Sequence, residues 1–231
     1  MTLPLILIEF DDVLAETHAP RSAALRDALA AEGVELTGDV YDTACSGLSF
    51  AGAARAAIRL ANLSGRATDE TAIELAALRA TRTFGEAVAR GIPLMRGAVE
   101  FVRSAAGLAR LGIVTRSPRR DVELTLSFSG LEDAFECAVT AEDYTGPEPA
   151  SAPFDAAFVR MSEGRAVRVG GNIALVASLN GVAAARAARL STIVVGALSP
   201  TVAFAGDGYL PTLERTTVRD VLRIGAAAEA R

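Results

Sequence analysis

The sequence predicts an α/β fold: a doubly wound parallel sheet with an α-helical cap inserted after its first strand. Short apolar runs recur along the chain, with the length and composition of buried parallel strands. Helical patterns separate these runs, as in βαβ units. The apolar runs cover 3–8, 108–115, 137–141, 173–177 and 191–196, and the helical patterns cover 99–106, 120–128, 154–161 and 181–189.

The stretch from about residue 17 to residue 91 has a different pattern. It contains no strand-like run and is rich in alanine, leucine and arginine at helical spacing. Its segments SAALRDALAAEG and TDETAIELAALRATRTFGEAVARG each end on a glycine, which is typical of a helix end. We therefore predict a helical cap domain at 17–91 and an α/β core domain made of 1–16 and 92–231.

The composition and net charge of the chain indicate which partners and which compartment to expect. The 231 residues carry a formal net charge of -5 and include no basic run interleaved with aromatic residues, so we expect no nucleic-acid partner. The apolar start of the chain is far shorter than the ~20 residues that span a bilayer, and it lacks the basic region of a signal peptide. Cys45 and Cys137 form no CxxC pair, as expected of buried thiols in a reducing compartment. We expect a cytoplasmic protein with no membrane partner.

Two residue types are nearly or wholly missing. All 23 basic residues are arginine, and the absence of lysine excludes Walker-A phosphate loops, pyridoxal-phosphate Schiff bases and lysine nucleophiles. The chain has one histidine, His18, which excludes histidine-rich metal sites. A Ser–His–Asp triad would have to use His18, and the sequence has no GxSxG elbow to accompany it.

Three carboxylates follow the first apolar run, in the segment LILIEFDDVLAET. This segment, together with VASLNGVAAARAARLSTIVVG at 176–196, resembles the haloacid dehalogenase (HAD) superfamily, in its β-phosphoglucomutase-like branch with a helical cap. The resemblance covers nearly the whole chain. It implies a HAD-like Rossmannoid core and, in catalytic members, Mg²⁺-dependent phosphoryl transfer.

The first family motif is altered at its nucleophile. The family reads Asp-x-Asp-Gly-(Thr/Val)-Leu, and Val13 and Leu14 fix the register so that Asp11 takes the acid/base position and Glu9 the nucleophile position. The extra methylene of glutamate moves the attacking oxygen by about an ångström, and a misplacement of that size can cost ~100-fold in rate.

The second motif is retained and the third is altered. Thr115 matches the hydroxyl that binds the transferring phosphoryl group, and Arg116 follows it where small polar residues are common. The third motif is a lysine before a KPxP-type turn, and here TGPEPASAPFDAAF keeps the turn but has Gly146 in place of the lysine.

The fourth motif keeps its serine and glycine but lacks its acidic residues. The segment LVASLNGV places Val176 and Ala177 where the family has its metal-binding carboxylates, while Ser178 and Gly181 remain. Neither alanine nor valine offers the oxygen ligand that Mg²⁺ requires. We therefore predict no metal site and expect no cofactor; Mg²⁺ would be expected only if hydrolase activity persisted.

These changes predict that the protein has lost the phosphoryl-transfer activity of the family. A phosphate ~4 Å from a carboxylate meets about 4 kcal/mol of repulsion per charge pair at an effective dielectric near 20, which the family cancels with Mg²⁺ and lysine. The leading hypothesis is a pseudoenzyme that binds a small phosphorylated or anionic ligand, or a protein. The alternatives are a residual phosphatase acting on a small phosphorylated metabolite, and a structural subunit of an assembly.

The candidate site residues carry open alternatives. Glu9 and Asp11 are either a working pair or a vestigial pair satisfied by backbone N–H groups or by Arg116, whose guanidinium we predict to reach one of them. Thr115, like Arg116 and Ser178, is a candidate ligand-binding residue; the alternative for Thr115 is a plain strand-end hydroxyl. Asp12 is expected to serve a turn or a helix cap, and His18 to lie at the surface or the hinge.

Overall fold

The computed structural model describes residues 2–61, 70–144, 146, 151–164, 166–168, 170–196 and 200–229. The strands are β1 (Leu5–Glu9), β2 (Arg110–Val114), β3 (Cys137–Val139), β4 (Ile173–Val176), β5 (Ser191–Val195) and β6 (Gly208–Leu210). The α-helices are α1 (His18–Ala30), α2 (Gly38–Val40), α3 (Phe50–Ala61), α4 (Glu70–Ala89), α5 (Ala98–Arg103), α6 (Arg119–Ser127), α7 (Ala152–Ser162), α8 (Leu179–Ala187), α9 (Pro200–Ala203) and α10 (Val218–Glu229). A π-helical turn, η1 (Tyr41–Cys45), and the 3₁₀ turns η3 (Glu132–Ala134) and η4 (Ala141–Asp143) complete the elements.

The strands form one parallel sheet in the order β3-β2-β1-β4-β5-β6. β1 lies at its centre, where Leu7 is in register with Gly112 of β2 and with Ala174 of β4. Because all the strands run in the same direction, the residues that follow them meet at one edge of the sheet. This edge is where the sequence places its carboxylates and hydroxyls.

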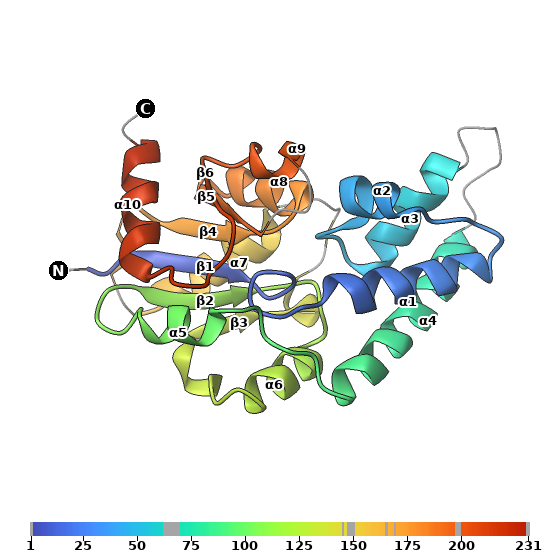
Figure 1. The fold of residues 1–231 in the computed structure, drawn as a ribbon, viewed down its shortest axis with the longest axis horizontal. Coiled ribbons are helices and arrows are strands. Elements are labelled where there is room, and N and C mark those ends of the chain that lie inside the picture. The colour runs from blue at the N-terminus through green and yellow to red at the C-terminus, as the bar shows by residue number, and fades with distance from the viewer. Residues whose placement is uncertain are drawn as a thin grey trace.

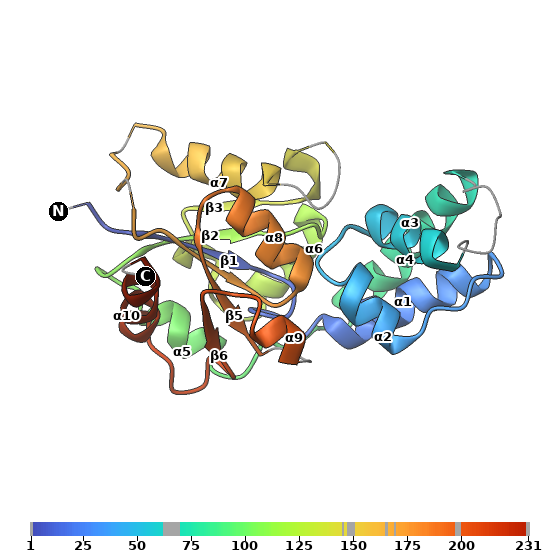
Figure 2. The same cartoon turned by 90° about the horizontal axis from the view of Figure 1, so that it is seen from above.

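Helices cover both faces of the sheet (Figure 1; Figure 2). The side chains of β1 alternate between the faces, because successive residues of a strand point to opposite sides. Leu5 and Leu7 pack in one apolar cluster with residues of α7 and α8, while Ile6 and Ile8 pack in another with residues of α5, α6 and α10. The sheet is therefore the middle of three layers, which explains why its strands are continuously apolar.

The cap helices α1, α3 and α4 pack against one another beside the carboxyl edge of the sheet (Figure 1). Their contact faces bury Leu25 of α1, Ile58 of α3, and Ile73 and Phe84 of α4. The turn after α1 ends at Gly33 with φ +72°, a left-handed conformation that glycine adopts at low cost. The cap apolar residues join the cluster on the α5/α6 face of the sheet, so core and cap share one continuous apolar interior.

The fold prediction is confirmed for the parallel sheet with its covering helices. All five apolar runs are strands, and all four helical patterns between them are helices, with ends that differ by a few residues. The sequence analysis missed β6 and α10, and the helix continues through the alanine-rich tail as far as Glu229. The domain limits at 16/17 and 91/92 remain predictions. No helix within the described ranges has both the length and the apolarity needed to cross a membrane.

Candidate functional site

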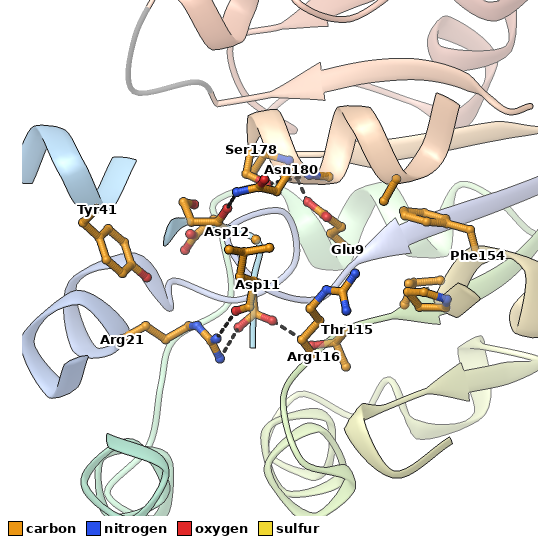
Figure 3. A pocket seen from close by; sticks show the side chains of 18 residues that line it. Glu9, Asp11, Asp12, Arg21, Tyr41, Thr115, Arg116, Phe154, Ser178 and Asn180 are labelled. Carbon is orange, nitrogen blue, oxygen red and sulfur yellow. Dashed lines mark hydrogen bonds and ion pairs between the residues drawn. The ribbon is translucent and has the colours of Figure 1, made fainter. Parts of the chain in front are cut away.

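The candidate site lies where β1, β2 and β4 end beneath the cap. Glu9 is the last residue of β1, Thr115 directly follows β2, and Ala177 directly follows β4. The parallel register therefore brings together three of the positions that the sequence analysis matched to family motifs. Glu9 and Asp11 point in opposite directions within this site (Figure 3).

Asp11 is held by two hydroxyls from the loop after β2. Thr115 Oγ1 donates to Asp11 Oδ2 at 2.7 Å, and Ser117 Oγ lies 3.1 Å from Oδ1. The Ser117 backbone N–H in turn donates to Thr115 Oγ1 at 2.9 Å, which fixes this hydroxyl as a donor to the carboxylate. Thr115 thus serves Asp11 directly. The structure favours the strand-end hydroxyl over an open anion site for this residue.

Arg21 of the cap helix α1 supplies the cation beside Asp11. Its Nη1 lies 3.5 Å from Asp11 Oδ1 and donates to Ser117 Oγ at 2.8 Å, and its Nη2 donates to the Leu48 carbonyl at 3.0 Å. The residue is only 5% exposed. Burial alone would lower the pKa of Arg21, but the charge on Asp11 and further neighbouring groups raises it. The guanidinium therefore stays charged in its buried position.

Two cap aromatics also contact Arg21. Its guanidinium carbon lies 4.5 Å from the centroid of the Phe50 ring and 5.2 Å from that of Phe84. Contacts of this kind stabilise a desolvated cation by ~1–2 kcal/mol. Arg21 was missed by the sequence analysis, because nothing in the local sequence of α1 distinguishes a buried arginine from an exposed one.

Glu9 faces the start of α8. Its Oε2 accepts the backbone N–H of Ala177 at 2.9 Å. Burial of the carboxyl group raises the pKa of Glu9 to about 8; the Ala177 bond and the charge of Arg116 oppose this shift, and the charges of Asp11 and Asp12 add to it. Burial therefore favours the protonated form of the carboxyl group at the nucleophile position.

The start of α8 leaves room for the long Glu9 side chain only because residue 181 is glycine. A Cβ on Gly181 would lie 2.3 Å from Glu9 Oε1 and 2.8 Å from Cδ. Ser178, 2% exposed, is the N-cap of α8 and accepts the Gly181 N–H at 2.9 Å. The predicted ligand-binding hydroxyl of Ser178 thus already has a capping role, although the residue lines the cavity.

These residues do not fit the Mg²⁺ ion that the fold family implies. Val176 and Ala177 offer no side-chain oxygen at the end of β4, and Glu9 directs an oxygen to a backbone N–H. The described part of the chain holds no group of three histidine, cysteine, aspartate or glutamate side chains placed to bind a metal. The sequence analysis predicted that Val176 and Ala177 supply no metal ligand, and the absence of a metal site stays a prediction.

Arg116 does not take the position that we predicted for it. The carboxylate of Asp11 pairs with Arg21 instead, while Arg116 Nη1 contacts the Tyr144 hydroxyl at 3.4 Å and its guanidinium lies 5.3 Å from the Tyr144 ring centroid. Arg116 still points into the cavity (Figure 3), where its charge lowers the pKa of Glu9. Among the described residues, Arg116 forms no hydrogen bond or ion pair with Glu9 or Asp11, and it acts on Glu9 through its charge.

The remaining sequence candidates have structural roles. Asp12 has φ +63° and its Oδ1 accepts both the N–H and the hydroxyl of Thr17, so it supports the turn into α1, as expected. His18 begins α1, lies at the hinge and contacts Asp42 at 2.7 Å through Nε2. Gly146 is exposed with φ +141°. The rest of the predicted third-motif turn, 147–149, lies outside the described residues.

A cavity of about 280 Å³ between core and cap is lined by Asp12, His18, Ser46 and Ala177, among other residues. The cavity that Glu9 and Asp11 line is smaller, about 30 Å³. Its lining is mixed in charge: Glu9, Asp11 and Asp12 face it, and so do Arg21 and Arg116. The sequence analysis predicted a guanidinium beside these carboxylates but assigned it to Arg116, whereas the arginine that pairs with Asp11 is Arg21 of the cap.

Comparison with known proteins identifies the class. The family model described as haloacid dehalogenase-like hydrolase matches residues 6–195. The chain belongs to this family, as the carboxyl-edge site, the sheet order and the helical insertion after β1 indicate. No curated protein matches the sequence.

Solved structures share the fold over its full length. β-Phosphoglucomutase from Clostridium difficile superposes with a TM-score of 0.80 at 13% identity, covering 100% of both chains. CbbY from Rhodobacter sphaeroides, solved in complex with phosphate, has a TM-score of 0.70 at 21% identity, covering 95% of this chain and 99% of its own. A HAD hydrolase of family IA, variant 3, from Entamoeba histolytica has a TM-score of 0.73 at 15% identity, covering 97% and 100%. The fold is therefore that of the β-phosphoglucomutase-like branch.

Proposed function

We propose that this HAD-family protein does not transfer phosphoryl groups and acts as a binding protein. One observation carries the proposal: the nucleophile position holds a glutamic acid whose carboxyl group accepts the Ala177 N–H and whose pKa is raised to about 8 by burial. Phosphoryl transfer depends on positioning and charge stabilisation. A carboxyl group turned to the Ala177 N–H, beside a β4 end that has no carboxylate, supports neither.

An assay with an aryl phosphate and Mg²⁺ tests this proposal. We expect no hydrolysis above the buffer rate for the unmodified protein. Hydrolysis that disappears in Asp11→Asn would instead establish a working phosphatase with Asp11 as its acid/base, and the proposal would be wrong.

Magnesium binding provides a test that does not depend on knowing the substrate. Calorimetric titration of the unmodified protein with Mg²⁺ should give only the heat of dilution, because the end of β4 offers no carboxylate. The matched variant Ala177→Asp puts one carboxylate back at that strand end and should bind Mg²⁺ more tightly than the unmodified protein. Saturable binding by the unmodified protein would contradict the proposal.

For the ligand, we propose a small phosphorylated or other anionic molecule. The support is that Arg21 and Arg116 both line the cavity, with backbone and hydroxyl groups around them. CbbY, a structural relative, was solved with phosphate. A thermal-shift screen against phosphorylated metabolites, with the same compounds lacking phosphate as controls, should raise the Tm for a phosphorylated member only.

A second candidate function is a structural or protein-binding subunit without a small ligand. The observation that favours it is the small volume of the cavity at Glu9 and Asp11, about 30 Å³, which is room for one or two water molecules. A flat result in the thermal-shift screen would favour this candidate. For either function we propose a cytoplasmic location, supported by the free thiols of Cys45 and Cys137.

A further inference from the structure

We propose that a hollow between α6 and the edge strand β3 binds a small organic cation, in which a compact apolar group carries a protonated amine. The hollow measures about 220 Å³ and shares no lining residue with the cavity at Glu9 and Asp11. It is therefore a separate site from the one beneath the cap, and the proposal does not depend on the anionic ligand proposed there.

Most of the lining of the hollow is apolar. It comes from the sheet, from α6 and from the segment between η3 and β3: Ile113, Ala138, Val122, Leu126 and Phe135. These side chains belong to, or pack against, the apolar cluster on the α6 face of the sheet (Figure 1). An apolar cavity of about 150 Å³ is enough to hold benzene, so this hollow has room for an aromatic ring with a short chain.

Two carboxylates at the rim have no partner within the protein. Glu123 of α6 and Glu132 of η3 both line the hollow, and both are exposed. Neither side chain forms a hydrogen bond or an ion pair with any residue in the described part of the chain. A ligand with a positive charge at the mouth of the hollow would supply the missing counter-charge.

The arginines beside the hollow are paired with other carboxylates. Arg119 Nη2 donates to both oxygens of Asp143, at 2.7 Å and 2.6 Å, and Arg160 Nη2 donates to the same carboxylate at 2.6 Å. The Glu142 carboxylate accepts the Arg119 backbone N–H at 3.1 Å, so two guanidiniums face two carboxylates there. The charge left over at the rim is therefore negative, which favours a cationic group and disfavours an anionic one.

The edge of β3 is less suited to an extended peptide as the occupant. The Val139 carbonyl accepts the Thr115 N–H from the β2 side, so the Ala138 carbonyl points away from the sheet. Arg160 Nη1 donates to that carbonyl at 3.1 Å. An added strand would have to displace this bond, whereas an apolar group in the hollow would leave it intact. The hollow therefore suits a small molecule rather than a strand.

Titration of the full chain with 2-phenylethylamine, followed by NMR, tests the proposal. We expect saturable shift changes at Val122 and Ala138, which line the hollow, and none at Ala177 beneath the cap. The neutral counterpart 2-phenylethanol should bind more weakly, by about two- to fivefold for each carboxylate that the amine meets. The anionic counterpart 3-phenylpropanoate should bind more weakly still.

Variants at the rim separate the contribution of charge from that of shape. Glu123→Gln and Glu132→Gln should each weaken binding of 2-phenylethylamine by about two- to fivefold and leave 2-phenylethanol unchanged. Asp133→Asn, exposed on the same turn as Glu132 but outside the lining, is the matched control and should change neither ligand. Ala138→Leu should fill the hollow and abolish binding of both. Because the rim variants are at exposed positions, they keep the test readable even if Ala138→Leu does not fold.

Several results would overturn the proposal. One is the absence of saturable shift changes at Val122 and Ala138 with the amine. Another is equal binding of the amine, the alcohol and the carboxylate, or binding of the amine that Glu123→Gln and Glu132→Gln leave unchanged. Shift changes of the same signals with protein concentration alone would assign the hollow to a second copy of the chain, which would also contradict a small organic cation.

Discussion

Glu9 and Asp11, at the end of β1, define two halves of the site. The halves differ in the groups that form hydrogen bonds and ion pairs with each carboxyl group. Asp11 is bonded to hydroxyls and to a cap arginine, so its half connects core to cap. Glu9 is bonded to a backbone N–H of the core alone. The first half pairs a carboxyl group with a guanidinium, and in the second half burial raises the pKa of the carboxyl group.

On the proposed function, this difference describes a site that has lost its chemistry and kept its fold. A phosphatase of this family uses both halves together, one for proton transfer and one for metal and nucleophile. Here the carboxyl group of Glu9 bonds to the Ala177 N–H, and no buried side-chain nitrogen or oxygen among the described residues is left without a partner. The acid/base half has acquired a structural role through Arg21. Four predictions test this difference between the Asp11 half and the Glu9 half of the site.

The largest effect should come from removing the charge of Asp11. Asp11→Asn leaves the Arg21 guanidinium buried without its counter-charge, and we expect the free energy of unfolding to fall by about 3 kcal/mol. Urea denaturation measures it, with Asp27→Asn on the exposed side of α1 as the control. A loss of unfolding free energy below ~1 kcal/mol would mean that Asp11 does not stabilise the buried Arg21 guanidinium, as this comparison of the two halves requires.

The next effect concerns the crowding around Glu9. Gly181→Ala places a Cβ against the Glu9 carboxyl group and should destabilise the protein by about 2 kcal/mol, as overpacking does. In a Glu9→Ala background the same change should be neutral or stabilising by up to ~1 kcal/mol, because alanine is the better helix former. If the cost of Gly181→Ala were the same in both backgrounds, Glu9 would not occupy that space in solution.

The third prediction is a pH dependence. The pKa of Glu9 is raised from 4.5 to about 8, so between these values the folded state binds a proton that the unfolded state has released. The unfolding free energy should therefore fall as pH rises from about 5 to 8, by at most ~1.4 kcal/mol per pH unit. Denaturation at several pH values should show this slope, and Glu9→Gln should flatten it. A slope of the same size in Glu9→Gln would assign the effect to another group.

The smallest effect should be at Asp12, in the turn between the halves. Asp12→Gly removes the cost of φ +63° but also removes the bonds to Thr17, and these terms of about 1 kcal/mol nearly cancel. Asp12→Ala keeps the strained backbone and loses the bonds, so it should be the less stable by about 1 kcal/mol. Thermal unfolding of the two variants compares them. Equal stabilities would mean that residue 12 is unstrained.

Several features of the fold follow from local sequence. Continuous apolar runs such as 173–176 can be buried on both faces only in a covered parallel sheet, so they predicted the strands. β6 was missed because its three residues are too short for a pattern. Helix α10 was missed although Val218 and Val221, both buried, stand three residues apart, as on a helix face. That spacing would have revealed it.

The candidate site was only partly predictable, for a different reason. Glu9, Asp11, Thr115 and Ala177 stand at strand ends, and strand ends of a parallel sheet converge wherever they lie in the sequence. The partner of Asp11 comes from the cap, and nothing local distinguishes Arg21 from Arg116, the residue that adjacency to a strand end favoured. The chain contains many arginines, and their surroundings decide which of them is buried.

The sequence by itself determined the sheet, the helical insertion and the missing metal ligands, because periodicity and residue chemistry are local properties. Only the tertiary structure decided that Glu9 turns to the α8 backbone, that Arg21 crosses to Asp11, and that Asn180 bonds to the cap. Each of these contacts joins segments that are far apart in the chain. Which side chains meet there, and which become buried or paired with a charge, depends on how folding places those segments in space.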